Sequence, residues 1–342
     1  MTDIDVSSAT NSPDGSGPRC ADWAREVGVD PIGTAASARG FLLLDWPLPW
    51  PRDASEIEAL APVRAALAGT GIRLQLVVPR PDADRWSIVR HDLGPDDDGW
   101  FSGYRRRAVS VAPADLSPAA VELIADRATA DGSEGSDGSD GLVGFDDSPE
   151  GGADLPGADP GLDVLLCGHG SRDRCCGSMG TALAMAATAD GLTVRRTSHT
   201  GGHRFAPTGL VLPHGTAWAF LDDEALARIV AMTGPIDDLL DRYRGCSAFA
   251  TPALQAAERV AFGAVGWSWL GYRRRATALE PGASGRQRVL VEGVDPEGRL
   301  RSWTVEVAPG RTLPVPECGK DPALAPKSET EVVIATATES PV

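Results

Sequence analysis

The amino-acid sequence predicts an α/β protein. Segments with helical periodicity alternate with apolar, strand-like runs over residues 20–128 and again over 161–275, and such alternation places helices on the faces of a sheet. The chain has 342 residues, which exceeds the usual size of one domain, so two α/β domains are expected. A third region, residues 286–309, has the pattern of a C-terminal β-hairpin about the turn Asp-Pro-Glu-Gly.

The first domain is expected to begin after a disordered N-terminus at residues 1–19, with a short helix and turn. The run FLLLDWPLPW at 41–50 is typical of a strand buried on both faces. Ser117 and Pro118 suit the N-cap and first position of a helix over 117–130. The other expected elements of this domain are a helix over 54–67 and strands over 72–80 and 86–94.

The second domain is expected to open with a buried strand in LDVLLCGHG, residues 162–170, which leads directly into a loop rich in cysteine. A helix over 180–191 follows, with Gly191 where a helix would stop. The remaining expected elements are strands over 192–199, 209–215 and 217–221 and helices over 222–232, 236–245 and 251–267. Residues 310–342 are expected to form a loose tail.

Charge and composition exclude several classes of partner. The net charge is -16 and the pI about 4.7, so nucleic acid and anionic membranes would be repelled. Part of this charge lies in residues 129–160, whose Gly, Ser and Asp content predicts an acidic linker. The N-terminus lacks the features of a signal peptide and no apolar run is long enough to span a membrane. The sequence therefore predicts a cytoplasmic protein.

Cysteines and histidines gather in two neighbouring segments. Cytosolic cysteines seldom form a disulfide framework, and clusters of them more often bind metal or carry redox chemistry. Cys167 and Cys176 are separated by eight residues on a strand-to-helix loop, and His199 and His203 flank a turn that contains two glycines. Two thiolates and two imidazoles form a complete ligand set for zinc or for a 2Fe-2S cluster of mixed ligation. The wide cysteine spacing favours an object larger than one ion.

The segments CGHGSRDRCCGSMG and SHTGGHRFAPTGLVLPHGTAW resemble the sucrase/ferredoxin-like family, which includes thioredoxin-like ferredoxins related to the yeast actin-patch-distribution protein. The resemblance extends over most of residues 20–265. It implies a thioredoxin-like ferredoxin domain in the second α/β unit and a 2Fe-2S cluster held by Cys167, Cys176, His199 and His203. Sucrase activity is not expected, because no acidic motif supplies the facing pair of carboxyl groups that glycoside hydrolysis needs.

Several residues beside these four leave alternatives open. Cys175 is a spare buried thiol, an alternative metal ligand, or half of a redox pair with Cys176. His169, Arg172 and Arg174 are candidates for contacts that orient the ligands or tune the potential of a cluster. The cysteines outside the loop are expected to be structural or incidental; these are Cys20, Cys246 and Cys318.

The function expected from the sequence is electron transfer with an unidentified redox partner protein, by an electron carrier and not a stand-alone enzyme. Two other functions remain open. The first is a structural zinc-binding protein that uses the same four ligands. The second is a thiol-disulfide oxidoreductase that uses Cys175 and Cys176, although the C-x-x-C arrangement usual for that chemistry is missing.

Overall fold

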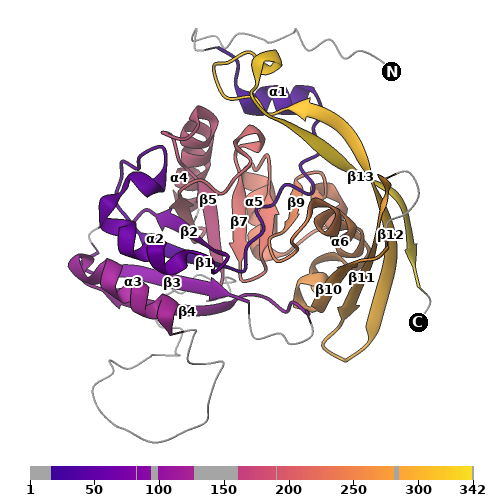
Figure 1. Ribbon diagram of the computed structural model, residues 1–342, viewed down its shortest axis with the longest axis horizontal. Helices are drawn as coiled ribbons and strands as arrows, with labels where there is room; N and C mark the ends of the chain where they lie inside the picture. The colour runs from indigo at the N-terminus through magenta and orange to yellow at the C-terminus, as the bar shows by residue number, and fades with distance from the viewer. Residues whose placement is uncertain are drawn as a thin grey trace, which may run out of the picture.

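The structure is a computed structural model that describes residues 17–81, 83–93, 99–126, 161–189, 191–280 and 285–340. Figure 1 shows a large mixed sheet with helices on its faces and a separate, smaller antiparallel sheet. The α/β class predicted from the sequence is therefore confirmed. The expected disordered start falls largely on residues 1–16, and the expected acidic linker falls on 129–160; both lie outside the described residues.

In the described part of the chain the large sheet has nine strands, in the order β4-β3-β1-β2-β6-β5-β7-β8-β9. Its elements divide at the middle of this order into a first unit and a second unit. The first unit contains β1 (Gly40–Asp45), α2 (Ala61–Leu67), β2 (Ile72–Val77), β3 (Trp86–Asp92), β4 (Arg105–Val111) and α3 (Leu116–Ala125). The second unit contains β5 (Asp163–Cys167), α4 (Thr181–Ala189), β6 (Val194–Thr197), β7 (Gly209–Leu212), β8 (Thr216–Trp218) and α5 (Asp223–Ala231).

Both units have the same connectivity. In the first unit β1 pairs parallel with β2 and antiparallel with β3, and β3 pairs antiparallel with β4. In the second unit β5 pairs parallel with β6 and antiparallel with β7, and β7 pairs antiparallel with β8. One helix joins the two parallel strands and another follows the last strand in each unit. The last residue of β1, Asp45, thus occupies the position that Cys167 occupies at the end of β5.

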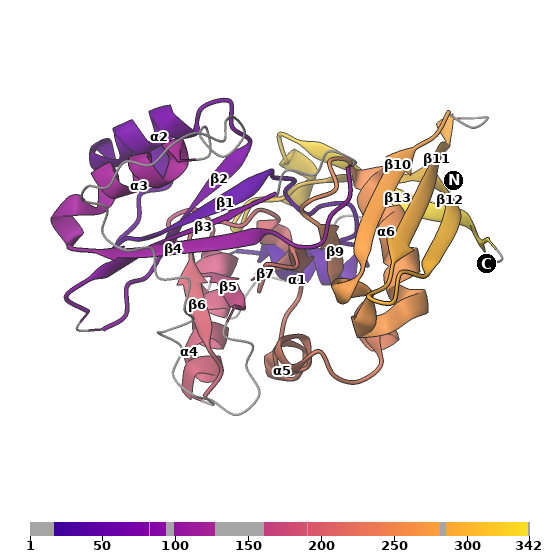
Figure 2. The same cartoon turned by 90° about the horizontal axis from the view of Figure 1, so that it is seen from below.

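The two units meet where β2 and β6 pair antiparallel through Val77 and Thr197, and they face each other across an apolar layer. Phe41 of β1 lies in the same buried cluster as Leu165 of β5. The next residue of β1, Leu42, belongs instead to the cluster covered by α2 and α3. Figure 2 shows α2 and α3 on the outer side of the first unit, with α4 and α5 on the opposite side of the molecule. The prediction that β1 is buried on both faces is confirmed.

A buried polar contact crosses between the units at the opposite end of β5 from Cys167. The Nε2 of His91, on β3, is 2.8 Å from the Oδ2 of Asp163. Arg106, on β4, donates a hydrogen bond to the same oxygen. His91 is fully buried. This residue therefore helps to join the two units. The domain boundaries at 20–128 and 161–275 remain predictions, because both units share one sheet.

The C-terminal region forms a four-stranded antiparallel sheet in the order β10-β11-β12-β13. Its strands are β10 (Arg273–Ala278), β11 (Gln287–Val294), β12 (Leu300–Pro314) and β13 (Ser328–Glu339). The predicted hairpin corresponds to β11 and β12. The expectation of a loose tail differs from the structure, because β13 pairs along β12. Helix α6 (Pro252–Val265) packs beside this sheet.

Some local predictions from the sequence were wrong. Ser117 is inside α3 and donates to the carbonyl of Ala59 instead of capping the helix. The expected helix over 236–245 is a short 3-10 turn followed by β9 (Tyr243–Cys246), which pairs with β8. Strand β4 was not predicted. Within the described residues, no helix combines the length and apolar character that crossing a membrane requires.

Candidate metal centre

Three of the four expected ligands converge at the carboxyl ends of β5 and β6. Ligand atoms of Cys167, Cys176 and His199 all lie within 4.8 Å of one another, and the Cys167 Sγ is 3.8 Å from the His199 Nδ1. Both cysteines are fully buried, whereas His199 is half-buried. Such a set of soft sulfur and imidazole donors suits zinc or iron.

Glycines bring the two cysteines of the loop together. Cys176 begins a single π-helical turn, Cys176–Gly180, that precedes α4, and such turns are frequent at functional sites. A Cβ on Gly180 would collide with the carbonyl oxygen of Cys167, and one on Gly177 would collide with the Cα of Gly170. The loop can fold back on the end of β5 only because these positions lack side chains.

The turn between the histidines is held by a buried arginine. Gly201 and Gly202 have positive φ angles of 89° and 68°, which glycine adopts without strain. Arg244 donates to the carbonyls of Gly201 and Thr34, at 3.1 and 2.5 Å. Burial lowers the pKa of Arg244 to about 10, so its guanidinium still carries a positive charge near neutral pH. This charge lies beside the turn that carries both imidazoles.

His203 is not part of the group formed by the other three ligands. Its ring centroid is 6.0 Å from that of His199. Its Nδ1 lies 3.2 Å from Oδ2 of Asp173 and 3.5 Å from the Sγ of Cys20. An Nδ1–H donated to the Asp173 carboxylate leaves the Nε2 of His203 as the nitrogen with a free lone pair, because a neutral imidazole carries one proton.

The pKa values of the two thiols in the group are shifted in opposite directions. The hydrogen bond from Cys176 lowers the pKa of Cys167 well below its usual value, although burial opposes this shift. The same bond, together with burial, raises the pKa of Cys176. These shifts favour the thiolate at Cys167 and the thiol at Cys176, so a metal bound by both sulfurs would displace the proton of Cys176.

His169 orients His199. Its Nδ1 accepts a hydrogen bond from the backbone N–H of His199 at 3.1 Å, so its Nε2–H donates to the carbonyl of Pro51 at 2.8 Å. Burial lowers the pKa of His169, which favours the neutral ring that this arrangement needs. Trp50 packs edge-on against the His169 ring. The backbone carbonyl of Trp50 accepts a hydrogen bond from the hydroxyl of Ser171. The segment after β1 thereby supports the loop between β5 and α4.

We expect His169→Ala to weaken metal binding at Cys167, Cys176 and His199 by about 10–100-fold, the range typical for lost supporting contacts. The backbone N–H of His199 would lose its hydrogen-bond acceptor, and the loop would lose its hydrogen bond to the carbonyl of Pro51. Competition with a chelator, followed by metal analysis, would measure the change. Arg172→Ala is the control, because Arg172 is exposed on the same loop. Equal retention of metal by both variants would contradict the positioning role of His169.

The other sequence candidates on this loop do not belong to the group of Cys167, Cys176 and His199. Arg172 is exposed, and half-buried Arg174 donates to the carbonyl of Gly17 at 3.0 Å. Cys175 is fully buried, and its Sγ lies 3.0 Å from the Sγ of Cys318. Cys175 and Cys176 thus belong to different groups of sulfurs even though they are adjacent in the chain.

Sequence reasoning missed the second group, in which ligand atoms of Cys20, Asp173, Cys175 and Cys318 lie within 4.8 Å of one another. Cys20 comes from α1 (Cys20–Glu26), and Cys318 follows β12. Since these two cysteines are 298 positions apart in the sequence, no spacing rule could connect them. The sequence offered one indication of a second group: four of its six cysteines remain after the first expected site has used Cys167 and Cys176.

The fold and its side chains define a mixed α/β protein in which the described residues form two Cys-rich groups able to hold metal. The family model described as sucrase/ferredoxin-like matches residues 31–245. The chain therefore belongs to the sucrase/ferredoxin-like family. Searches of curated proteins and of solved structures found no match.

Proposed function

We propose that this protein transfers electrons by means of a 2Fe-2S cluster bound to Cys167, Cys176, His199 and His203. The observation that carries the proposal is the convergence of two buried thiols and a half-buried imidazole at the ends of β5 and β6, with a second imidazole ring beside the first. Membership of a family described as sucrase/ferredoxin-like supports the ferredoxin interpretation.

The donor set fits such a cluster. Cys167 and Cys176 supply thiolates from the buried side, while His199 and His203 present imidazoles from the more exposed side. The side chain of His203 is 19% exposed, and its Nε2 is the nitrogen available for a metal. Mixed thiolate and imidazole ligation is known for 2Fe-2S centres.

When bound, the cluster would supply a one-electron redox couple, and the protein residues would set its environment. Two neutral imidazoles in place of two thiolates reduce the negative charge at the site, which favours a higher potential than that of an all-cysteine ferredoxin. Arg244 adds a buried positive charge behind the histidine turn. The buried cysteine side excludes water, so a redox partner would approach the histidine side.

The thiol-disulfide alternative has less support. An oxidoreductase of that kind needs an accessible thiolate and a second thiol that can reach it. Cys175 and Cys176 are both fully buried, and their sulfurs lie in different groups. A structural zinc ion on the first group would use the same ligands as the cluster, so metal analysis must separate those two functions.

We expect protein purified without air to absorb visible light and to contain about two irons and two labile sulfides per chain, as a 2Fe-2S centre requires. His199→Cys should retain the cluster, change its spectrum and lower its midpoint potential, because a thiolate adds negative charge. Cys246→Ala is the matched control, since this buried cysteine lies in a different apolar cluster. A colourless wild-type protein that contains zinc and no sulfide would contradict the proposal.

A further inference from the structure

Three cysteines that are distant in the sequence meet around one carboxylate. The Sγ of Cys318 lies 3.4 Å from that of Cys20 and 3.0 Å from that of Cys175. The Oδ1 of Asp173 is 3.3 Å from the Cys318 Sγ and 3.6 Å from the Cys20 Sγ. We propose that Cys20, Cys175, Cys318 and Asp173 bind one structural Zn²⁺, at a site separate from the proposed cluster.

The donor set and its geometry suit zinc. Zinc prefers four ligands at tetrahedral corners, with Zn–S bonds of about 2.3 Å, so that bound sulfurs lie about 3.8 Å apart. The sulfurs here need to move apart by less than about 1 Å to reach that spacing. A disulfide would join only two of the three sulfurs and would make no use of the carboxylate. Three thiols with one carboxylate oxygen complete a four-ligand shell.

Binding of Zn²⁺ by this group requires the thiolate form of its three cysteines. The ion would displace the thiol protons of Cys20, Cys175 and Cys318 to solvent and leave three thiolates and the Asp173 carboxylate around it.

Asp173 connects this group with the first one. Its Oδ1 faces the sulfurs and accepts from the backbone N–H of Cys175 at 2.9 Å, while its Oδ2 accepts from the Nδ1 of His203 at 3.2 Å. A carboxylate that accepts from a ligand histidine orients the ring and fixes its tautomer. The zinc site would therefore hold the carboxylate that presents the Nε2 of His203 to the neighbouring centre.

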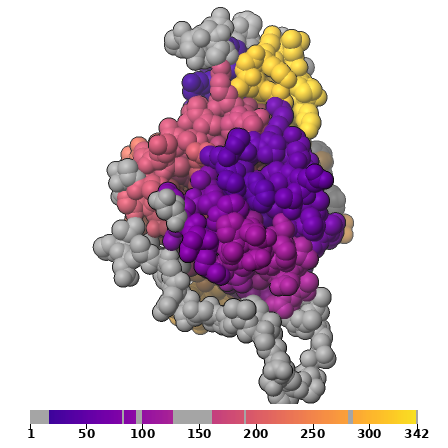
Figure 3. All heavy atoms as spheres, turned by 90° about the vertical axis from the view of Figure 1, so that its left-hand side faces the viewer, coloured from indigo at the N-terminus to yellow at the C-terminus, as the bar shows by residue number. Residues whose placement is uncertain are grey.

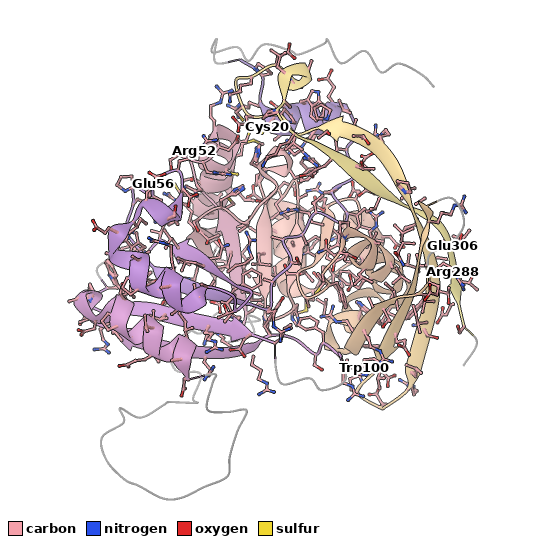
Figure 4. All side chains as sticks on the ribbon, viewed as in Figure 1. Cys20, Arg52, Glu56, Trp100, Arg288 and Glu306 are labelled. Carbon is pink, nitrogen blue, oxygen red and sulfur yellow. The ribbon has the colours of Figure 1, made fainter. Side chains whose placement is uncertain are left out.

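The site would also join α1 and the segment between β12 and β13 to the loop after β5. Cys20 lies on α1 at the end of the molecule where the C-terminal segment passes (Figure 4). The N–H of Gly319 donates to the carbonyl of Pro18 at 2.9 Å, next to the cysteines themselves. In Figure 3 the yellow C-terminal residues cover this end beside indigo N-terminal ones. A zinc ion would link α1, the loop after β5 and the segment after β12.

The test is elemental analysis and zinc-edge X-ray absorption on the full chain, purified without air. We expect about one zinc per chain, with three sulfur neighbours at about 2.3 Å and one oxygen or nitrogen neighbour. Zinc should persist in Cys167→Ala/Cys176→Ala, which removes the thiolates of the first group. It should fall at least about tenfold in Cys318→Ser, the loss expected on removing a thiolate ligand, but stay in Cys246→Ala.

Absence of zinc from the wild type, iron in its place, or full zinc retention by Cys318→Ser would overturn the inference. So would a disulfide between Cys175 and Cys318 in freshly purified protein, detected by counting thiols before and after reduction. The absorption spectrum of the wild type decides the question even if a variant fails to fold. Zinc bound by three sulfurs in a protein without iron or sulfide would refute the electron-transfer proposal and leave the zinc site standing.

Discussion

Gly180→Ala is expected to destabilise the protein by about 3 kcal/mol or more, the upper end of the cost of overpacking a closed site. The added Cβ would overlap the carbonyl oxygen of Cys167, and neither backbone can move away without displacing Cys167 or the π-helical turn that begins at Cys176. In an ordinary helical turn, replacing glycine with alanine stabilises the helix by about 1 kcal/mol. A loss of stability in Gly180→Ala would therefore be evidence for the steric collision. The contact between Cys167 and Cys176 should be lost with it.

Denaturant unfolding and metal analysis of the purified variant would measure both effects. Gly271→Ala is the matched control, because a Cβ there meets nothing within 4 Å. The free energy of unfolding of the control should lie within about 0.5 kcal/mol of the wild-type value, as is usual for surface substitutions. Its metal content should be unchanged. A Gly180→Ala protein as stable as the control would show that the loop does not need to approach the end of β5 so closely.

Glu258→Gln is expected to cost about 3–5 kcal/mol, the usual price of leaving a buried charge without its partner. Glu258 and Arg274 are both fully buried, with Nη1 3.3 Å from Oε1. Glu258 also accepts from the hydroxyl of Tyr243 at 2.8 Å and from Nε1 of Trp269 at 2.7 Å. The carboxylate thereby ties α6 to β9 and to the small sheet, and glutamine cannot neutralise the Arg274 charge.

The control for this change is Glu292→Gln in the neighbouring strand β11. Glu292 pairs with Arg275 at 2.8 Å, but the arginine side chain is 34% exposed, so the loss should stay below about 1 kcal/mol. Replacing Glu258 and Arg274 together, as Glu258→Gln/Arg274→Met, should recover part of the stability because the unpaired charge is gone. Equal effects of Glu258→Gln and Glu292→Gln on the free energy of unfolding would contradict the importance of the buried pair.

Strands and helices with strong local patterns were predictable from the sequence. The continuous apolar run at 41–50 reads as a strand buried on both faces, and Phe41 and Leu42 do enter different clusters. Edge strand β4 was missed because its sequence begins with three arginines and exposes much of its surface. Residues 243–245 belong to the helix expected over 236–245 but lie in β9, because hydrogen bonds to β8 outweigh a weak local preference.

The tail shows the same limit. Strand β13 has a polar, mostly exposed sequence, and its strand conformation comes from pairing along β12. Nothing in the residues themselves demands that partner. A sequence pattern reports the burial of a strand, whereas the edge on which it pairs depends on what the rest of the chain leaves open.

The sequence by itself determined the α/β class, the family resemblance and the pairing of Cys167 and Cys176 with a histidine turn, because these signals lie within short stretches of chain. Only the tertiary structure decided that the Nδ1 of His203 faces Asp173 and that Cys175 belongs with Cys20 and Cys318. The physical reason is that metal ligands have to meet in space and not along the chain. Residues separated by 298 positions can share one ion when a helix and a strand end bring them within a few ångströms.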